Sequence, residues 1–197
     1  MSAPDAARLT AQMAFLNEAD RLKSVIRANR LCDGSRYENT AEHSWHLALY
    51  ALTLAEHAPE KIDSTRVIAM LLLHDLVEID AGDNPVFGNV DEAAKAADED
   101  RAAERIFGLL PPDQAAQFRA LWDEFEANET PEARFAKSLD RFQPPNQNLA
   151  SNGGSWVEYD TQYDQFETRV AQKIDAGAPT LWAWLKPRVQ AWFKANR

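Results

Sequence analysis

A histidine–aspartate doublet, His74-Asp75, stands inside the apolar stretch VIAMLLLHDLVEI. A carboxylate is rarely buried without a partner, because an unpaired charge in an apolar interior is costly. A divalent cation would satisfy both side chains, and Glu78 follows at helical spacing, so that it can border the same cleft. A buried ion pair with an arginine or a hydrogen bond to backbone is the competing interpretation of the doublet.

Two further residues extend this set of potential ligands. His43 stands at the start of another helical stretch and shares a face with His46. For His46 and His57, ordinary core or surface positions are the preferred interpretation. Asp140 lies in FAKSLDRFQPP, where a solvated carboxylate in a helix of mixed charge would be the common explanation if it stood alone.

The composition limits the classes of function. A net charge of −10 and a pI near 4.9 argue against binding to a nucleic-acid polymer or an anionic membrane, because both need a basic surface. A small phosphorylated substrate remains compatible, since a metal and a few arginines can reverse the sign within one cleft. The single cysteine, Cys32, and the lack of a signal peptide or apolar span favour a cytoplasmic protein.

The elements that position these residues are predicted to be helices throughout, in an all-α fold of one domain. No convincing alternation typical of a strand is present, and glycine is scarce. Capping signals place helix starts at Asn39, at Asp63 or Ser64, and at Thr130-Pro131. Prolines are expected to interrupt helices at Pro144-Pro145 and at Pro187. The predicted helices cover about 5–26, 39–56, 63–81, 91–107, 113–126 and 130–143, with two more near the carboxyl end.

The order of these residues is similar to the H…HD…D signature of the HD-domain superfamily of metal-dependent phosphohydrolases. Three stretches carry the resemblance: ENTAEHSWHLALYALTLAE, LLLHDLVEIDAGDNP and TPEARFAKSLDRFQP. It is closest to the small HD hydrolases that include the bacterial 5′-deoxynucleotidases. The resemblance spans roughly residues 20–185, so that it implies a single helical HD-domain bundle over 1–197.

The resemblance also implies the chemistry. It assigns roles to six side chains, with His43, His74, Asp75 and Asp140 as metal ligands and Glu78 and Asp83 as catalytic carboxylates. Such a ligand set suits one divalent ion, Mn²⁺, Co²⁺, Fe²⁺, Zn²⁺ or Mg²⁺, and does not choose among them. The expected reaction is attack of activated water on a phosphomonoester, most simply a nucleoside 5′-monophosphate. Resembling enzymes are often homodimers, and the same is expected here.

Three arginines before the first metal histidine are candidates for binding substrate phosphate: Arg27, Arg30 and Arg36. The family commonly has an Arg-Trp pair in this region, but Leu31 follows Arg30 here. The absence of this tryptophan bears on selectivity for deoxynucleotides more than on phosphatase chemistry. For each arginine taken alone, plain surface charge is the competing interpretation.

Other functions find less support. The sequence has no CxxC, EF-hand, Walker A, GxGxxG or GxSxG motif. Within the same fold, the substrate could be an alarmone, a dNTP or a cyclic nucleotide. A non-catalytic module with a structural metal would need neither Glu78 nor Asp83. A plain helical scaffold would leave the buried His74-Asp75 pair without a function. The six tryptophans favour core or subunit-interface packing over base stacking.

Overall fold

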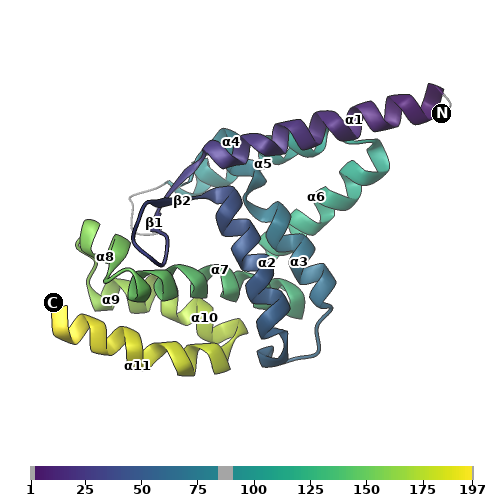
Figure 1. The fold of residues 1–197 in the computed structure, drawn as a ribbon. Helices are drawn as coiled ribbons and strands as arrows, with labels where there is room; N and C mark the ends of the chain where they lie inside the picture. The colour runs from purple at the N-terminus through teal and green to yellow at the C-terminus, as the bar shows by residue number, and fades with distance from the viewer. Residues whose placement is uncertain (1–2, 84–90, 197) are drawn as a thin grey trace.

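The computed structural model describes residues 3–83 and 91–196, which form a bundle of helices (Figure 1). The helices of ten residues or more are α1 (Ala3–Ala19), α2 (Thr40–Leu54), α3 (Ser64–Leu73), α5 (Glu92–Phe107), α6 (Pro112–Ala127), α7 (Pro131–Ala150) and α11 (Pro179–Asn196). The shorter helical segments are η1 (Asp20–Ser24), η2 (Ala55–His57), η3 (His74–Val77), α4 (Glu78–Ala81), α8 (Gly154–Glu158), α9 (Tyr163–Phe166), η4 (Glu167–Ala171) and α10 (Gln172–Gly177). Within the described ranges, no helix has the length and apolar character needed to cross a membrane. The all-α prediction is confirmed.

The predicted helix starts are confirmed by their capping contacts. The Asn39 side chain accepts a hydrogen bond from the Glu42 backbone N–H at 2.9 Å, and the Glu42 carboxylate accepts one from the Asn39 N–H at 3.1 Å. The Asp63 side chain caps α3, and Thr130 Oγ1 accepts from the Ala133 N–H at 3.2 Å to begin α7. These caps satisfy backbone donors that have no partner within the helix.

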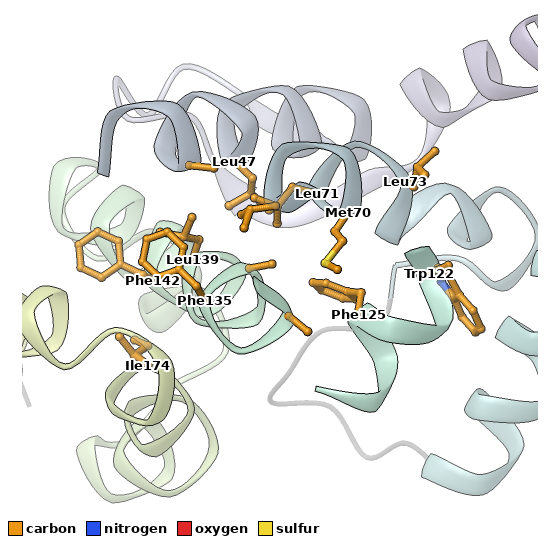
Figure 2. Close-up of a cluster of buried hydrophobic side chains, with 14 of the residues drawn as sticks. Leu47, Met70, Leu71, Leu73, Trp122, Phe125, Phe135, Leu139, Phe142 and Ile174 are labelled. Carbon is orange, nitrogen blue, oxygen red and sulfur yellow. The ribbon is translucent and has the colours of Figure 1, made fainter. Parts of the chain in front are cut away.

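The core lies where α3 packs between α2, α6 and α7. Figure 2 shows side chains from these helices meeting in one cluster, with α10 closing the far side of α7. The labelled members are Leu47, Met70, Leu71, Leu73, Trp122, Phe125, Phe135, Leu139, Phe142 and Ile174. Asp140 belongs to α7, and the His-Asp doublet begins η3, directly after Leu73 at the end of α3. Because α3 and α7 meet in this cluster, the bundle holds these side chains in fixed positions.

Several predicted helix ends are wrong. The helix predicted to run to residue 26 ends as α1 at Ala19 and continues only as the 3₁₀ segment η1. The predicted stop at Pro144-Pro145 does not occur, because α7 continues to Ala150. Pro187 likewise does not divide α11. Proline removes a backbone donor, but burial of the apolar faces of α7 and α11 compensates for the missing bonds.

A two-stranded antiparallel hairpin corrects the expectation that the chain has no strands. β1 (Ile26–Arg30) pairs with β2 (Tyr37–Asn39), with Arg30 opposite Tyr37 and an irregular register between the ends. The turn contains Gly34 at φ 72°, in the left-handed region that glycine adopts freely. The strands are short and rich in arginine and asparagine, so no alternation of apolar residues marked them. The hairpin lies beside α7 and α8 and carries Arg27 towards the site.

Candidate active site

Four of the predicted residues converge although three separate helical elements carry them. His43 comes from α2, His74 and Asp75 from η3, and Asp140 from α7. His43 Nε2 lies 3.0 Å from Asp140 Oδ1 and 3.8 Å from Asp75 Oδ2. His74 Nε2 lies 3.1 Å from Asp75 Oδ2 and 3.8 Å from Asp140 Oδ1. Two imidazole nitrogens and two carboxylates therefore face one small volume.

The donors fit a divalent cation. One ligand atom from each of His43, His74 and Asp75 lies within 4.8 Å of the others, and Asp140 adjoins both histidines. His74 Nδ1 lies 2.9 Å from the Leu71 carbonyl, so Nδ1 carries the proton there when the ring is neutral. His74 Nε2 is then buried without a hydrogen-bond partner, close to Asp75 but outside hydrogen-bonding geometry. An imidazole oriented by its second nitrogen, with its first nitrogen unpartnered, is typical of a metal ligand.

The pKa values of the cluster also indicate a site that attracts a cation. Burial lowers the pKa of His74, but the carboxylates of Asp75 and Asp140 outweigh burial and raise it to about 10. Burial raises the pKa of Asp75, whereas His74 and Arg27 bring it down to about 2. The pKa of Asp140 is well below its ordinary value, because Arg141 and the two imidazoles outweigh burial. Without a metal, the cluster therefore attracts a proton onto His74, and a divalent cation would compete for the same place.

Glu78 and Asp83 lie in the same pocket. Glu78 is the first residue of α4, and its carboxylate accepts a hydrogen bond from Thr40 Oγ1 at 3.0 Å. Burial, reinforced by the charge of Asp75, raises the pKa of Glu78 well above its ordinary value. Burial also raises the pKa of Asp83, although Arg27 partly opposes it. Groups with raised pKa values can exchange protons nearer to neutral pH than ordinary carboxyls.

The three candidate arginines have different surroundings. Arg27 lines the pocket, and its Nη1 donates to Asp75 Oδ2 and to Asp83 Oδ1, each at 3.3 Å. Arg30 instead donates to Glu158 at 2.8 Å and stacks on the Tyr37 ring at 4.5 Å. Neither Arg30 nor Arg36 lines the pocket.

Arg36 is exposed and forms a forked pair with Glu42, at 2.6 and 2.8 Å. Of the three predicted substrate-binding arginines, the structure brings only Arg27 to the metal cluster.

The pocket also includes basic residues that the sequence did not single out. Lys137 and Arg141 flank Asp140 on α7, and Lys95 comes from α5. Each has an acidic neighbour: Lys95 lies 3.4 Å from Glu99, Lys137 3.1 Å from Glu126, and Arg141 3.6 Å from Asp140. The spacing of Lys137 and Arg141 around Asp140 was visible in the sequence, but only the fold shows that they face the pocket.

Apolar and aromatic residues also line the pocket. They are Trp122, Phe125, Pro144, Pro145, Trp156, Tyr159, Phe166 and Val170. Asn29 and Asn148, which are hydrogen-bonded to each other at 3.1 Å, add polar groups to the lining. The prolines that were expected to end α7 thus form part of the site. A pocket lined by both charged groups and aromatic surface is typical of sites for small organic phosphates.

Behind His43 lies a buried polar cluster that no feature of the sequence indicated. Glu38, Gln143 and Gln147 are almost entirely buried, and both glutamines donate a hydrogen bond to Glu38. The His43 imidazole and Arg27 hold the pKa of Glu38 below its ordinary value against the opposing effect of burial. Two glutamines in a helix carry no signal of their own, because glutamine is common on helix surfaces.

The fold and the site define a class: all-α proteins with a pocket whose His/Asp cluster can hold a divalent metal. The sequence profile of the HD domain matches residues 19–182, and the chain belongs to this family. The chain is also similar in structure to a predicted metal-dependent phosphohydrolase from Magnetospirillum magnetotacticum MS-1. That likeness has a TM-score of 0.88 and 46% identity, and it covers 95% of this chain and 96% of the other.

Curated relatives give a consistent comparison. The chain is 28% identical to the human 5′-deoxynucleotidase HDDC2 over 130 residues, which make up 66% of this chain and 62% of the relative. It is 31% identical to the 5′-deoxynucleotidase hdd1 of Schizosaccharomyces pombe over 144 residues, 71% of each chain. The match therefore spans somewhat less than two thirds of the human relative. The resemblance to the HD-domain superfamily is confirmed.

Proposed function

We propose that this protein is a metal-dependent phosphohydrolase that releases inorganic phosphate from nucleoside 5′-monophosphates, with a preference for deoxynucleotides. The observation that carries the proposal is the convergence of His43, His74, Asp75 and Asp140 at a pocket that also contains Glu78. The relatives named 5′-deoxynucleotidases and the family of the domain support the same activity.

The four converging residues are the proposed ligands of one divalent ion, Mn²⁺, Co²⁺, Fe²⁺, Zn²⁺ or Mg²⁺. Such an ion supplies Lewis-acid stabilisation of the phosphoryl charge and a lower pKa for water.

The remaining pocket residues have proposed roles in proton transfer and positioning. Glu78 takes a proton from the attacking water as the new P–O bond forms. The bond between phosphorus and the 5′ oxygen breaks, and Asp83, whose pKa is raised, supplies the proton that the leaving alkoxide needs. Arg27, held between Asp75 and Asp83, provides a cation next to the phosphoryl oxygens.

The charge balance of the pocket favours a monophosphate over a longer phosphate chain. Lys95, Lys137 and Arg141 would suit a polyphosphate, but each is paired with a carboxylate within 3.6 Å. Aromatic lining residues such as Trp156 and Tyr159 offer apolar surface for the nucleoside. A nucleoside 5′-monophosphate has a single phosphate for the charged residues and a nucleoside for the apolar lining.

The test is phosphate release from ribo- and deoxyribonucleoside 5′-monophosphates, each with Mn²⁺, Co²⁺, Zn²⁺ or Mg²⁺ and beside a chelated control. We expect metal-dependent turnover that is faster for the deoxy set, and loss of turnover in folded Asp75→Ala protein. If folded, metal-loaded protein releases no phosphate from any substrate of the panel, the proposal is overturned. Alarmones, triphosphates and cyclic nucleotides in the same panel examine the alternative substrates.

We also propose that the protein forms a homodimer through α2. Trp45, Leu49 and Leu52 share one face of this helix and are 60%, 39% and 67% exposed. Exposed apolar side chains in a row are typical of an interface between proteins. Light scattering on a sizing column should give a dimer for the native chain and a monomer for Trp45→Glu. Val157→Glu, which changes an exposed apolar residue of α8, is the control and should stay dimeric.

A further inference from the structure

A chain of hydrogen bonds runs from His43 into the interior, away from the pocket. Gln143 Oε1 lies 3.1 Å from His43 Nδ1, and Gln143 Nε2 donates to Glu38 Oε1 at 3.1 Å. The same Nε2 lies 3.2 Å from His46 Nδ1, and Gln147 Nε2 donates to Glu38 at 2.8 Å. Glu38, Gln143 and Gln147 are at most 1% exposed, and none lines the pocket.

The donor and the acceptor of each hydrogen bond in this series follow from which atoms carry a proton. A carboxylate oxygen has no proton to give, so Gln143 must turn its NH₂ group towards Glu38. The second N–H of this group is directed to His46 Nδ1, so both amide protons of Gln143 are used. The amide oxygen of Gln143 is then left facing His43 Nδ1, which must act as the donor.

The proton on Nδ1 decides what the other ring nitrogen can do. A neutral imidazole carries one N–H, so a proton held at Nδ1 leaves His43 Nε2 with a lone pair. That atom faces the carboxylates of Asp140 and Asp75, at 3.0 and 3.8 Å, so a lone pair on Nε2 is stable there only when a cation lies between them. In the opposite tautomer, Nε2 would carry the proton and would be unable to bind a metal.

The other carboxylate oxygen of Glu38, Oε2, lies near both His43 and Arg27. Glu38 Oε2 lies 3.5 Å from His43 Nδ1 and 3.7 Å from Arg27 Nε. Arg27 in turn contacts Asp75 and Asp83 through Nη1. One buried carboxylate therefore supports both a proposed ligand and the arginine of the pocket.

We propose that Glu38 and Gln143 are positioning residues that hold His43 in the Nδ1–H tautomer, with Nε2 free to bind a metal. The inference rests on the metal site of the proposed function, but the tautomer can be measured without any turnover. Residues that orient a ligand through its second nitrogen change metal affinity by about 10- to 100-fold when they are replaced.

The experiment uses three variants of the full chain. Gln143→Met removes the acceptor at Nδ1, and Glu38→Gln keeps the volume but loses the group that orients Gln143. Gln147→Met is the matched control, because it removes an equally buried hydrogen bond to Glu38 without touching His43. Long-range ¹H–¹⁵N spectra of the histidine side chains, recorded over a series of pH values in metal-free protein, report which ring nitrogen carries a proton. Calorimetric titration with Zn²⁺ reports affinity.

We expect Nδ1 of His43 to carry a proton in the native chain and in Gln147→Met. In Gln143→Met and Glu38→Gln we expect the Nε2–H form to be populated and Zn²⁺ affinity to fall by about 10-fold or more. An Nε2–H tautomer in the native chain, an unchanged tautomer in both test variants, or an equal loss in Gln147→Met would overturn the proposal. If the native chain has the Nδ1–H tautomer and binds Zn²⁺ but releases no phosphate, the positioning role stands and the proposed function fails.

Discussion

His43 Nε2 lies 3.0 Å from Asp140 Oδ1, although 97 positions separate the two residues in the chain. The contact joins α2 to α7 next to the pocket, which Asp140 lines. A proposed ligand pair of this kind exists only in the folded chain, so metal binding and folding are linked.

The first prediction concerns metal and stability. A ligand that binds only the folded state at 100 times its Kd adds about 2.7 kcal/mol to the free energy of unfolding. We expect Mn²⁺ or Zn²⁺ at that excess to raise the Tm of the native chain and to leave Asp140→Asn almost unchanged. Scanning calorimetry with and without chelator measures both. Equal stabilisation of the two proteins would argue against Asp140 as a ligand.

The second prediction concerns pH in the metal-free protein. The pKa of His74 is about 10 in the folded state, against about 6.5 in the unfolded state. A raised folded pKa contributes stability that is fully present below about pH 6.5 and is lost as the pH rises towards about 10. Denaturant unfolding across this window should show a decline that His74→Gln reduces. Saturating metal should also reduce it, because the metal replaces the proton on Nε2; a decline unaffected by either would count against this account.

The third prediction concerns Glu78. Its carboxylate contacts Thr40 and lies next to Asp75, yet the proposed ligands do not include it. Glu78→Gln should keep Zn²⁺ affinity within a few-fold and lower kcat by about 10²- to 10⁴-fold, which is the usual contribution of a general base. Single-turnover phosphate release measures the effect. Normal turnover in this variant would remove Glu78 from the chemistry.

The fourth prediction separates two of the candidate arginines. Arg27 contacts Asp75 and Asp83, whereas Arg36 is paired with Glu42 on the surface. A hydrogen bond to a charged group contributes about 1.5–3 kcal/mol, which corresponds to a loss of roughly 10- to 100-fold in kcat/KM for Arg27→Met. Arg36→Met should stay within about two-fold of the native value, since Arg36 does not line the pocket and its surface pair with Glu42 affects stability rather than kcat/KM. Similar losses in both would contradict the assignment.

The fifth prediction concerns the packing of α10 on α7. A Cβ at Gly177 would lie 2.3 Å from the Arg134 carbonyl oxygen and 2.4 Å from Ser138 Oγ. Gly177→Ala should therefore force the helices apart and destabilise the protein by about 1–3 kcal/mol. Urea unfolding measures the change in the free energy of unfolding. Ala176→Ser, at an exposed neighbouring position of α10, is the control, and equal midpoints would refute the close contact.

Local signals explain which parts of the fold were predictable. The caps at Asn39, Asp63 and Thr130 act within a few residues of the chain, so the helix starts could be read directly. The continuation of α7 through Pro144-Pro145 could not be predicted from the sequence, because burial against other helices outweighs the local effect of proline. The hairpin was missed for a similar reason, since its pairing depends on contacts outside the strands.

The spacing of the motifs predicted which residues would carry the chemistry, from His43 to Asp140, but not the distances between them. Asn84 and Pro85, which end the second motif, lie outside the described residues.

The sequence by itself determined the helical class, because periodicity and capping are local properties of the chain. Through their resemblance to the HD-domain superfamily, its ordered motifs also indicated the family and the side chains expected to hold a metal. Tertiary structure decided which charges share the pocket. It brought Arg27, Lys137 and Arg141 to the cluster, left Arg30 and Arg36 paired elsewhere, and buried Glu38 against Gln143. These outcomes depend on how distant helices pack, and no single stretch of the chain encodes the position of another.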